Sequence, residues 1–200
     1  EEIILYGENT IIESLDKYNF TISADSFFQT NTEQAEKLYS IIKNEAKLSG
    51  NEIVYDLFCG TGSISIYLAN SAKMVYGFEL VNSAIQNAIQ NALNNKTKNV
   101  WFFPGDLKDL FRTNIESSQI ENPDVMIIDP PRAGLHPNTI IDIIKKSPKR
   151  MIYVSCNPAT QVRDLKPICE NNYKIINIQP IDMFPHTPHI ENVVTLTLKD

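Results

Sequence analysis

The chain has 200 residues, of which 42% are hydrophobic and 21% are charged, so it is long enough for one domain with a full core. No apolar run approaches the roughly 18 residues that predict a transmembrane helix, and the first residues, EEIILYG, lack the basic start and apolar centre of a signal peptide. The net charge of −6 argues against a nucleic-acid-binding domain, because such domains are usually basic.

The cysteine pattern indicates neither a disulfide framework nor a zinc site. Cys59, Cys156 and Cys169 are odd in number and include no CxxC pair. Free thiols are typical of a reducing compartment, so we expect a cytoplasmic protein. His186 and His189 have no third ligand nearby in the sequence, so no metal site is predicted.

Residues 1–30 differ from the rest and are predicted to form a strand or hairpin appendage. The extended segments EIILYG and TIIESLDKYNFTIS flank a turn expected at Gly7–Asn9. Neither an internal repeat nor a low-complexity linker is present, so residues 31–200 are expected to form one domain.

Strand and helix patterns alternate from about residue 32 onward. Short apolar runs rich in β-formers predict strands at residues 52–58, 74–80, 99–106, 124–132 and 150–156. Helical patterns lie at residues 32–49, 63–71, 82–95, 138–146 and 161–171. Two final strands, at residues 173–184 and 191–200, have no helix between them and should be antiparallel. These elements predict an α/β fold with a mostly parallel seven-stranded sheet, an antiparallel last strand and helices on both faces.

A glycine turn follows the first parallel strand. The segment DLFCGTG (56–62) places Gly60 and Gly62 at the sheet edge where α/β proteins bind ligands. It matches neither GxGxxG nor GxxxxGK[ST], which disfavours a dinucleotide enzyme and a P-loop. By itself, the turn is as compatible with a structural role as with a ligand site.

Carboxylates at the neighbouring strand ends favour a ligand site. Glu79 ends the second parallel strand, where a carboxylate can accept both hydroxyls of a ribose. Asp106 ends the third, where it could accept a hydrogen bond from an adenine amino group. Aligned with Asp56 and the glycine turn, these acids indicate an adenosine-type ligand without a phosphate requirement, and S-adenosylmethionine fits best.

Two further strand ends carry the reaction chemistry. The segment DPPR (129–132) resembles the DPPY loop of amino-methylating enzymes, but Arg132 replaces the aromatic residue that holds an amine. Cys156 ends the neighbouring strand, which Asn157 and Pro158 terminate. A thiolate that adds to C6 of uracil makes C5 nucleophilic enough to take a methyl group. A general base must then remove the C5 proton, and Glu191 is the candidate.

Five segments resemble the RNA uracil-5-methyltransferase family, in the family's order, from about Phe20 to Leu198. They are FFQTNTEQAEKLY, DLFCGTGSISIYLA, IDPPRAGLHP, YVSCNPATQVRDL and MFPHTPHIENVVTL. SCNPAT and FPHTxHxE are specific to that family. The resemblance implies a Rossmann-like class I methyltransferase fold that uses S-adenosyl-L-methionine.

By position, the resemblance implies that Cys156 is the nucleophile and that Glu191 accepts the C5 proton. Asp129 is expected to contact the cofactor and to orient the uracil. Phe27 is expected to stack on a flipped base or to pack in the core, as is its neighbour Phe28. Arg132 is expected to steady an enolate oxygen or a phosphate.

Cofactor contacts are implied at Gln29, Phe58, Gly60, Ser63, Glu79, Asp106 and Asp129. Ser63 falls where many relatives have Asn, although its hydroxyl can still hydrogen-bond. Arg163 is expected to pair with Asp164 or to contact a phosphate.

The resemblance leaves the RNA substrate open between 23S ribosomal RNA and the T-loop of transfer RNA. The ending HTPHIENVV favours the ribosomal branch. A base in folded RNA must be extruded, and RNA binding needs a positive surface, yet this chain is acidic. We therefore expect residues 31–200 to be a catalytic domain whose N-terminal RNA-binding domain lies outside this sequence.

No membrane, DNA or obligate protein partner is expected. One alternative of another class is a cofactor-binding, RNA-docking module without turnover, which the presence of both Cys156 and Glu191 disfavours. A nucleotide-dependent reductase is disfavoured by the missing GxGxxG.

Overall fold

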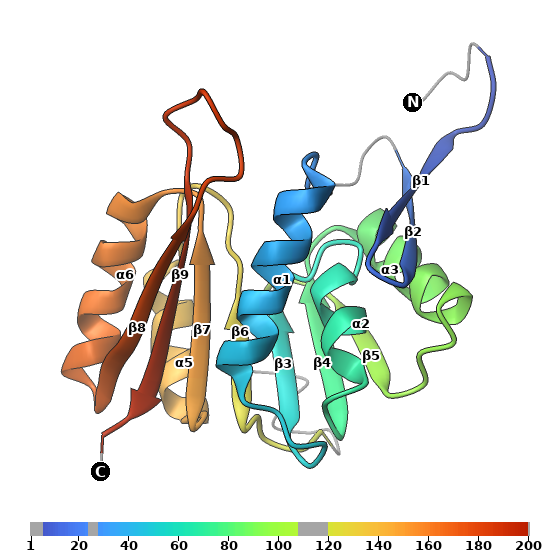
Figure 1. The fold of residues 1–200 in the computed structure, drawn as a ribbon. Coiled ribbons are helices and arrows are strands. Elements are labelled where there is room, and N and C mark those ends of the chain that lie inside the picture. The colour runs from blue at the N-terminus through green and yellow to red at the C-terminus, as the bar shows by residue number, and fades with distance from the viewer. Residues whose placement is uncertain (1–5, 24–27, 108–119, 200) are drawn as a thin grey trace.

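The computed structural model describes residues 6–23, 28–107 and 120–199. Within these ranges a seven-stranded sheet carries helices on both faces (Figure 1). Its strands are β3 (Ile53–Leu57), β4 (Met74–Glu79), β5 (Val100–Pro104), β6 (Val125–Ile128), β7 (Arg150–Ser155), β8 (Tyr173–Ile181) and β9 (Glu191–Leu198). The helices are α1 (Thr32–Ala46), α2 (Ser63–Ala69), α3 (Asn82–Asn94), α5 (Pro137–Lys146) and α6 (Pro158–Glu170). Within the described ranges, no helix combines the length and apolar composition that crossing a bilayer requires.

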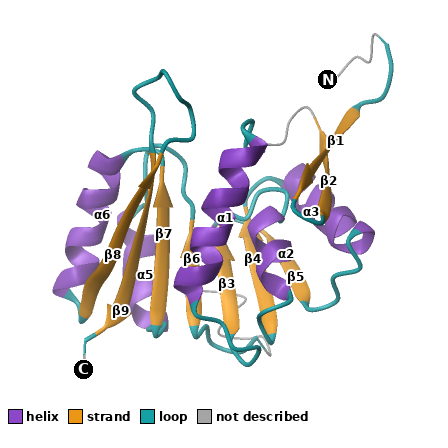
Figure 2. Cartoon of the chain, in the orientation of Figure 1, coloured by secondary structure: helices purple, strands orange, loops and turns teal. Residues whose placement is uncertain are grey.

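The strand order is β5-β4-β3-β6-β7-β9-β8. Neighbours from β5 to β7 are parallel, whereas β9 is antiparallel to both β7 and β8. Helices alternate with the parallel strands along the chain, and β8 and β9 then follow each other through a loop (Figure 2). The predicted mostly parallel sheet with an antiparallel last strand is confirmed.

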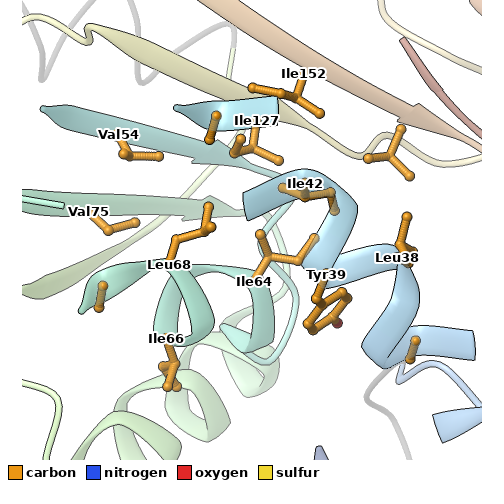
Figure 3. Close-up of a cluster of buried hydrophobic side chains, with 14 of the residues drawn as sticks. Leu38, Tyr39, Ile42, Val54, Ile64, Ile66, Leu68, Val75, Ile127 and Ile152 are labelled. Carbon is orange, nitrogen blue, oxygen red and sulfur yellow. The ribbon is translucent and has the colours of Figure 1, made fainter. Parts of the chain in front are cut away.

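Successive residues of the central strands point to opposite faces and build two cores. On one face Val54 packs in the cluster that includes α1 and α2, where Ile42 and Leu68 are fully buried (Figure 3). On the other face Tyr55 packs in a cluster with Ile143 of α5 and residues of α6. Because both faces are covered, these strands read in the sequence as continuous apolar runs.

Two helices begin where their cap residues place them. Asn31 caps α1 by accepting a hydrogen bond from the Gln34 amide at 3.2 Å. Asn157 caps α6 by accepting from the Ala159 amide at 3.1 Å, with Pro158 as the first helical residue. The sequence pattern placed the start of α6 near Gln161, three residues later, whereas the Asn157 cap and Pro158 set the true start.

The hairpin consists of β1 (Thr10–Leu15) and β2 (Tyr18–Ser23). Leu15 pairs with Tyr18, so the chain reverses at Asp16 and Lys17, and the prediction of one extended segment over residues 10–23 was wrong. Asp16 adopts a left-handed φ of 53°, which a two-residue hairpin turn requires and which Asp tolerates. Residues 1–5, where most of the other predicted strand falls, lie outside the described residues.

Asn91 on α3 fastens this hairpin to the main domain. It is fully buried, and its Oδ1 accepts from the Thr21 amide of β2 at 2.7 Å. Its Nδ2 lies 3.2 Å from the Thr21 carbonyl and 3.2 Å from the Thr61 carbonyl in the glycine turn. One side chain therefore connects β2 to the loop that follows β3.

Replacing this amide should loosen the hairpin. Asn91→Ala leaves partly buried backbone groups of Thr21 without the Asn91 amide, and we expect it to lower the free energy of unfolding by about 2 kcal/mol. Urea denaturation measures this loss, and hydrogen exchange at the Thr21 amide should accelerate. Asn94→Ala, an exposed change on the same helix, is the matched control. An equal loss in the two variants would contradict the anchoring role.

Candidate active site

The antiparallel pairing of β7 with β9 brings Cys156 and Glu191 to the same edge of the sheet. The register pairs Ser155 with Asn192. Cys156 and Glu191, each one residue nearer that edge, therefore lie opposite each other. Asp129 reaches the same edge because β6 ends at Ile128, next to β7. The structure thus brings together the three residues that the sequence analysis assigned to catalysis.

Arg132, in the loop after β6, lies beside this group. Burial raises the pKa of the Cys156 thiol and the charge of Glu191 adds to the rise, whereas a hydrogen bond from Arg132 and its charge oppose it. Burial also raises the pKa of Glu191, to about 7, again opposed by Arg132. The pKa of the Cys156 thiol remains above its usual value, and Arg132 limits the rise.

The surroundings of Asp129 favour its protonated form. Burial raises its pKa well above the usual range, and the charges of Glu191 and Asp56 raise it further. Carboxylates that lie close together cannot all ionise at little cost, because like charges repel in a poorly solvated site. Glu191 is 6% exposed, and burial raises its pKa to about 7, so this carboxylate is partly ionised near neutral pH.

Glu79 faces the glycine turn at the end of β4. Its Oε2 accepts from the Gly60 amide at 3.1 Å, and its Oε1 accepts from the Val81 amide at 2.9 Å. The Gly105 amide donates to the Glu79 carbonyl at 2.9 Å, which holds the end of β5 and the half-buried Asp106 beside Glu79. The two acids predicted for ribose and adenine therefore lie next to each other.

The turn itself is unusually tight. Phe58, Gly60 and Gly62 all have left-handed φ angles, of 64°, 52° and 77°. Such a φ is uncommon outside glycine, and its occurrence at Phe58 is typical of a backbone held for function. A Cβ on Gly62 would lie 2.7 Å from the ring of Phe102 and 2.9 Å from Ala88, so glycine is required there for space as well as for φ.

Several buried acceptors in this region lack partners among the described residues. Gln29 Oε1, Asp56 Oδ1 and Thr61 Oγ1 are buried and make no hydrogen bond within the described part of the chain. The other Asp56 oxygen accepts from Ser65 at 2.6 Å, and burial raises the pKa of Asp56 to about 7. Because β3 ends at Leu57, Asp56 lies inside the strand rather than at its tip. Orphaned buried polar atoms are rare in proteins and commonly face a bound molecule.

Two of the predicted contact residues have other neighbours. The Ser63 hydroxyl is buried and hydrogen-bonds to Tyr39 of α1 at 2.7 Å. Phe27 lies outside the described residues. Its neighbour Phe28 packs on Phe20 of the hairpin, with ring centroids 5.6 Å apart, so Phe28 contributes to the core.

The remaining predictions concern charged and metal-binding groups. Arg163 forms an ion pair with Asp164 at 2.8 Å, which confirms one of its two expected roles. His186 and His189 are exposed in the loop between β8 and β9. The described residues contain no group of three or more His, Cys, Asp or Glu side chains placed to hold a metal ion.

The sequence analysis did not single out Gln161, which is buried behind the site and hydrogen-bonds to Asn192, next to Glu191. A signal was available. Gln161, Leu165 and Ile168 share one face of α6 at helical spacing. A polar residue on an otherwise apolar helix face predicts a buried hydrogen-bonding role.

The topology, with β9 inserted between β7 and β8, defines a Rossmann-like class I methyltransferase fold. The precorrin-6y C5,15-methyltransferase of Geobacter metallireducens shares this fold, with a TM-score of 0.67 over 89% of this chain and 93% of that one. Its sequence is only 12% identical, so the likeness concerns the fold alone.

The family is defined by sequence. A family model described as tRNA (Uracil-5-)-methyltransferase matches residues 5–199. A Bacteroides thetaiotaomicron protein named as an uncharacterized RNA methyltransferase is 46% identical over 98% of this chain and 43% of its own length. A Porphyromonas gingivalis protein of the same name is 47% identical over 98% of this chain and 42% of its own. The chain belongs to this family, as predicted, and spans less than half the length of these relatives.

A solved structure supports the assignment of the chain to this family. The Pyrococcus abyssi tRNA (uracil-54, C5)-methyltransferase, crystallised with S-adenosyl-L-homocysteine, is 36% identical to this chain, with a TM-score of 0.81. The match covers 96% of this chain and 45% of that protein.

The two glycines of the turn should differ in their tolerance of a side chain. Gly62→Ala adds a close contact with Phe102 to a strained φ, and we expect it to lower the free energy of unfolding by about 3 kcal/mol. Gly60→Ala has open space around its Cβ and should cost about 1 kcal/mol from φ alone. Urea denaturation of both variants distinguishes them, and equal losses would show that the packing against Phe102 is unimportant.

Arg132 should control the reactivity of Cys156. Arg132→Gln removes the hydrogen bond and the charge that oppose the rise in the pKa of Cys156, so its alkylation by iodoacetamide should slow at every pH below that pKa. Arg132→Lys keeps the charge and should retain most of the rate. The rate is read by mass spectrometry at Cys156, with Cys169 in the same molecule as the internal control. Unchanged alkylation in Arg132→Gln would refute this role.

Proposed function

We propose that the full-length protein transfers a methyl group from S-adenosylmethionine to C5 of a uridine in RNA, through a covalent bond between Cys156 and C6 of the base. The observation that carries this proposal is the register of β7 and β9, which sets a thiol opposite a carboxylate whose pKa is about 7. Membership of the family supports the reaction class. Residues 31–200 would be the catalytic domain and residues 1–30 an appended hairpin, in a cytoplasmic protein.

The edge formed by β3, β4 and β5 suits S-adenosylmethionine. Glu79 and Asp106, held side by side, would accept from the ribose hydroxyls and the adenine amino group. Phe58 and Gly60 would line the turn, while the unpartnered Gln29 Oε1 would take a polar group of the ligand. Ser63 would contact the cofactor while it keeps its bond to Tyr39, because a hydroxyl can both donate and accept. When bound, the cofactor supplies an electrophilic methyl group.

The catalytic residues act in sequence on the uracil ring. The Cys156 thiolate forms a bond to C6, and the electron pair of the C5–C6 double bond moves to C5. Arg132, which stabilises the thiolate, would also steady the negative charge on the enolate oxygen. Asp129, whose pKa burial raises well above the usual range, would hydrogen-bond to the base and so orient it.

Glu191 completes the reaction. After methylation, C5 carries both the new methyl group and its original proton. The Glu191 carboxylate takes that proton, the C–H electrons re-form the C5–C6 double bond, and the bond from C6 to sulfur breaks to release the thiolate. Because its pKa is about 7, Glu191 is ionised and able to act above that pH and is progressively protonated below it.

RNA is the expected partner, and two substrates compete. The ending HTPHIENVV supports 23S ribosomal RNA, whereas the transfer-RNA enzyme from Pyrococcus abyssi supports the T-loop of transfer RNA. Incubating the full-length protein with unmodified ribosomal and transfer RNA and labelled S-adenosylmethionine, followed by mapping of 5-methyluridine, decides between them. Label in neither RNA would overturn the proposal.

Substitutions of Cys156 and Glu191 should block different steps of the reaction. Cys156→Ala should form no covalent adduct on RNA that contains 5-fluorouridine, whereas Cys169→Ala should form it normally. Glu191→Gln should form the adduct on natural RNA but release product roughly 10² to 10⁴ times more slowly, because only deprotonation is impaired. Glu170→Gln, an exposed change on α6, is its control. Release by the wild type should rise with pH and level off above about pH 7. An adduct in Cys156→Ala would refute the assignment of the nucleophile.

A further inference from the structure

The first turns of α6 touch both segments that carry the partners of Cys156. The helix begins at Pro158, two residues after the thiol. Its side chains bond to β9 on one side and to the loop after β6 on the other. One rigid element, attached directly to the nucleophile, thus contacts the supports of Glu191 and Arg132.

On the side of β9, Gln161 binds the residue next to Glu191 at two points. Its Nε2 donates to the Asn192 carbonyl at 3.0 Å, and its Oε1 accepts from the Asn192 side-chain amide at 2.7 Å. The same Nε2 donates to the Tyr153 carbonyl of β7 at 3.0 Å. Gln161 is only 1% exposed, so water does not compete for these bonds. A two-point contact fixes the position and rotation of Asn192, and with them the peptide that carries Glu191.

On the other side, α6 holds the loop of Arg132. Asp164 is 1% exposed and accepts from the Leu135 amide at 2.7 Å and from the Tyr153 hydroxyl at 2.8 Å. The Arg132 carbonyl accepts from Thr160 at 3.2 Å. The loop and β9 are therefore fixed to the same helix by separate side chains, and each can be perturbed without the other.

We propose that Gln161 is a positioning residue for Glu191, acting through Asn192 and never touching the RNA. The inference rests on the proposed function of Glu191 as the base that removes the C5 proton. A base displaced by about 1 Å can lose roughly two orders of magnitude in rate, so a fixed β9 matters most for that one step. Adduct formation depends on Cys156 and Arg132. Gln161 bonds to neither residue, and its one bond to β7 is at Tyr153, three residues before Cys156.

Single-turnover kinetics with the full-length protein tests this separation. Gln161→Met keeps the length of the side chain and removes its three hydrogen bonds. We expect product release to slow by roughly 10- to 100-fold, with adduct accumulating on natural RNA, while the rate of adduct formation and the KM for S-adenosylmethionine stay unchanged. The pH profile of product release should also shift, because loss of the Gln161 hydrogen bonds changes the surroundings of Glu191. Gln90→Met, an exposed change on α3, is the control and should release product at the wild-type rate.

Asn192→Ala provides a second variant should Gln161→Met fold poorly. It removes only the bond at 2.7 Å and should slow release in the same direction by a smaller factor. The double variant should release product no more slowly than Gln161→Met alone. The hydrogen bond that Asn192→Ala removes is already absent in Gln161→Met.

The outcomes separate the inference from the proposed function. If the wild type makes no 5-methyluridine, or Glu191→Gln accumulates no adduct, the proposed function fails and the inference fails with it. If both hold, the inference alone is overturned by wild-type release in the folded Gln161→Met or Asn192→Ala variants. It is equally overturned if adduct formation and release slow by the same factor.

Discussion

β9 runs against the other strands of the sheet and hydrogen-bonds to β7 on one side and β8 on the other. In a parallel pair, the two carboxyl ends would meet at this edge, and a residue that begins a strand could not lie there. The reversal of β9 brings its first residue, Glu191, to the edge where β7 delivers Cys156. A shift of one residue in the register would turn the Glu191 side chain to the other face of the sheet. The candidate chemistry therefore depends on this one strand pairing, and buried Val193 and Val194 on opposite faces help to hold it.

The cofactor half of the site is built differently. Its residues follow parallel strands, and backbone amides that donate to the carboxylate and the carbonyl of Glu79 hold them together. The Glu79 carboxylate accepts hydrogen bonds from the amides of Gly60 and Val81. The Gly105 amide, after β5, donates to the Glu79 carbonyl at the end of β4. Glycine is needed where the backbone approaches other groups this closely, as the space around Gly62 shows. One half of the site thus depends on strand register and the other on the backbone geometry of the turns.

The sequence predicted the layout of the sheet because continuous apolar strands such as Ile53–Leu57 can only be buried on both faces. It also predicted which residues share the catalytic edge, since strand order follows from the family resemblance and the edge from strand direction. It missed the turn of the β1–β2 hairpin, because Asp16 adopts the left-handed conformation there and no glycine marks the position. It did not find Arg132 beside Cys156 as the group that stabilises the thiolate, nor Gln161 behind Glu191. Both contacts join residues more than 20 positions apart, and local patterns do not encode such distances.

In the proposed mechanism, the position of Arg132 creates a conflict between attack by the Cys156 thiolate and proton transfer to Glu191. Its charge stabilises the Cys156 thiolate, and the same charge lowers the basicity of Glu191. Burial works against it at both residues, raising the pKa of each. The thiol must ionise to attack, so it benefits from the guanidinium, whereas the base is most effective with a pKa near the working pH. Burial compensates for Arg132 at Glu191 and leaves its pKa at about 7, where the carboxylate is both available and basic enough to act. A carboxylate more exposed to water would have a lower pKa and would be a weaker base in the proposed proton transfer, so the burial of Glu191 at the first residue of β9 favours that step.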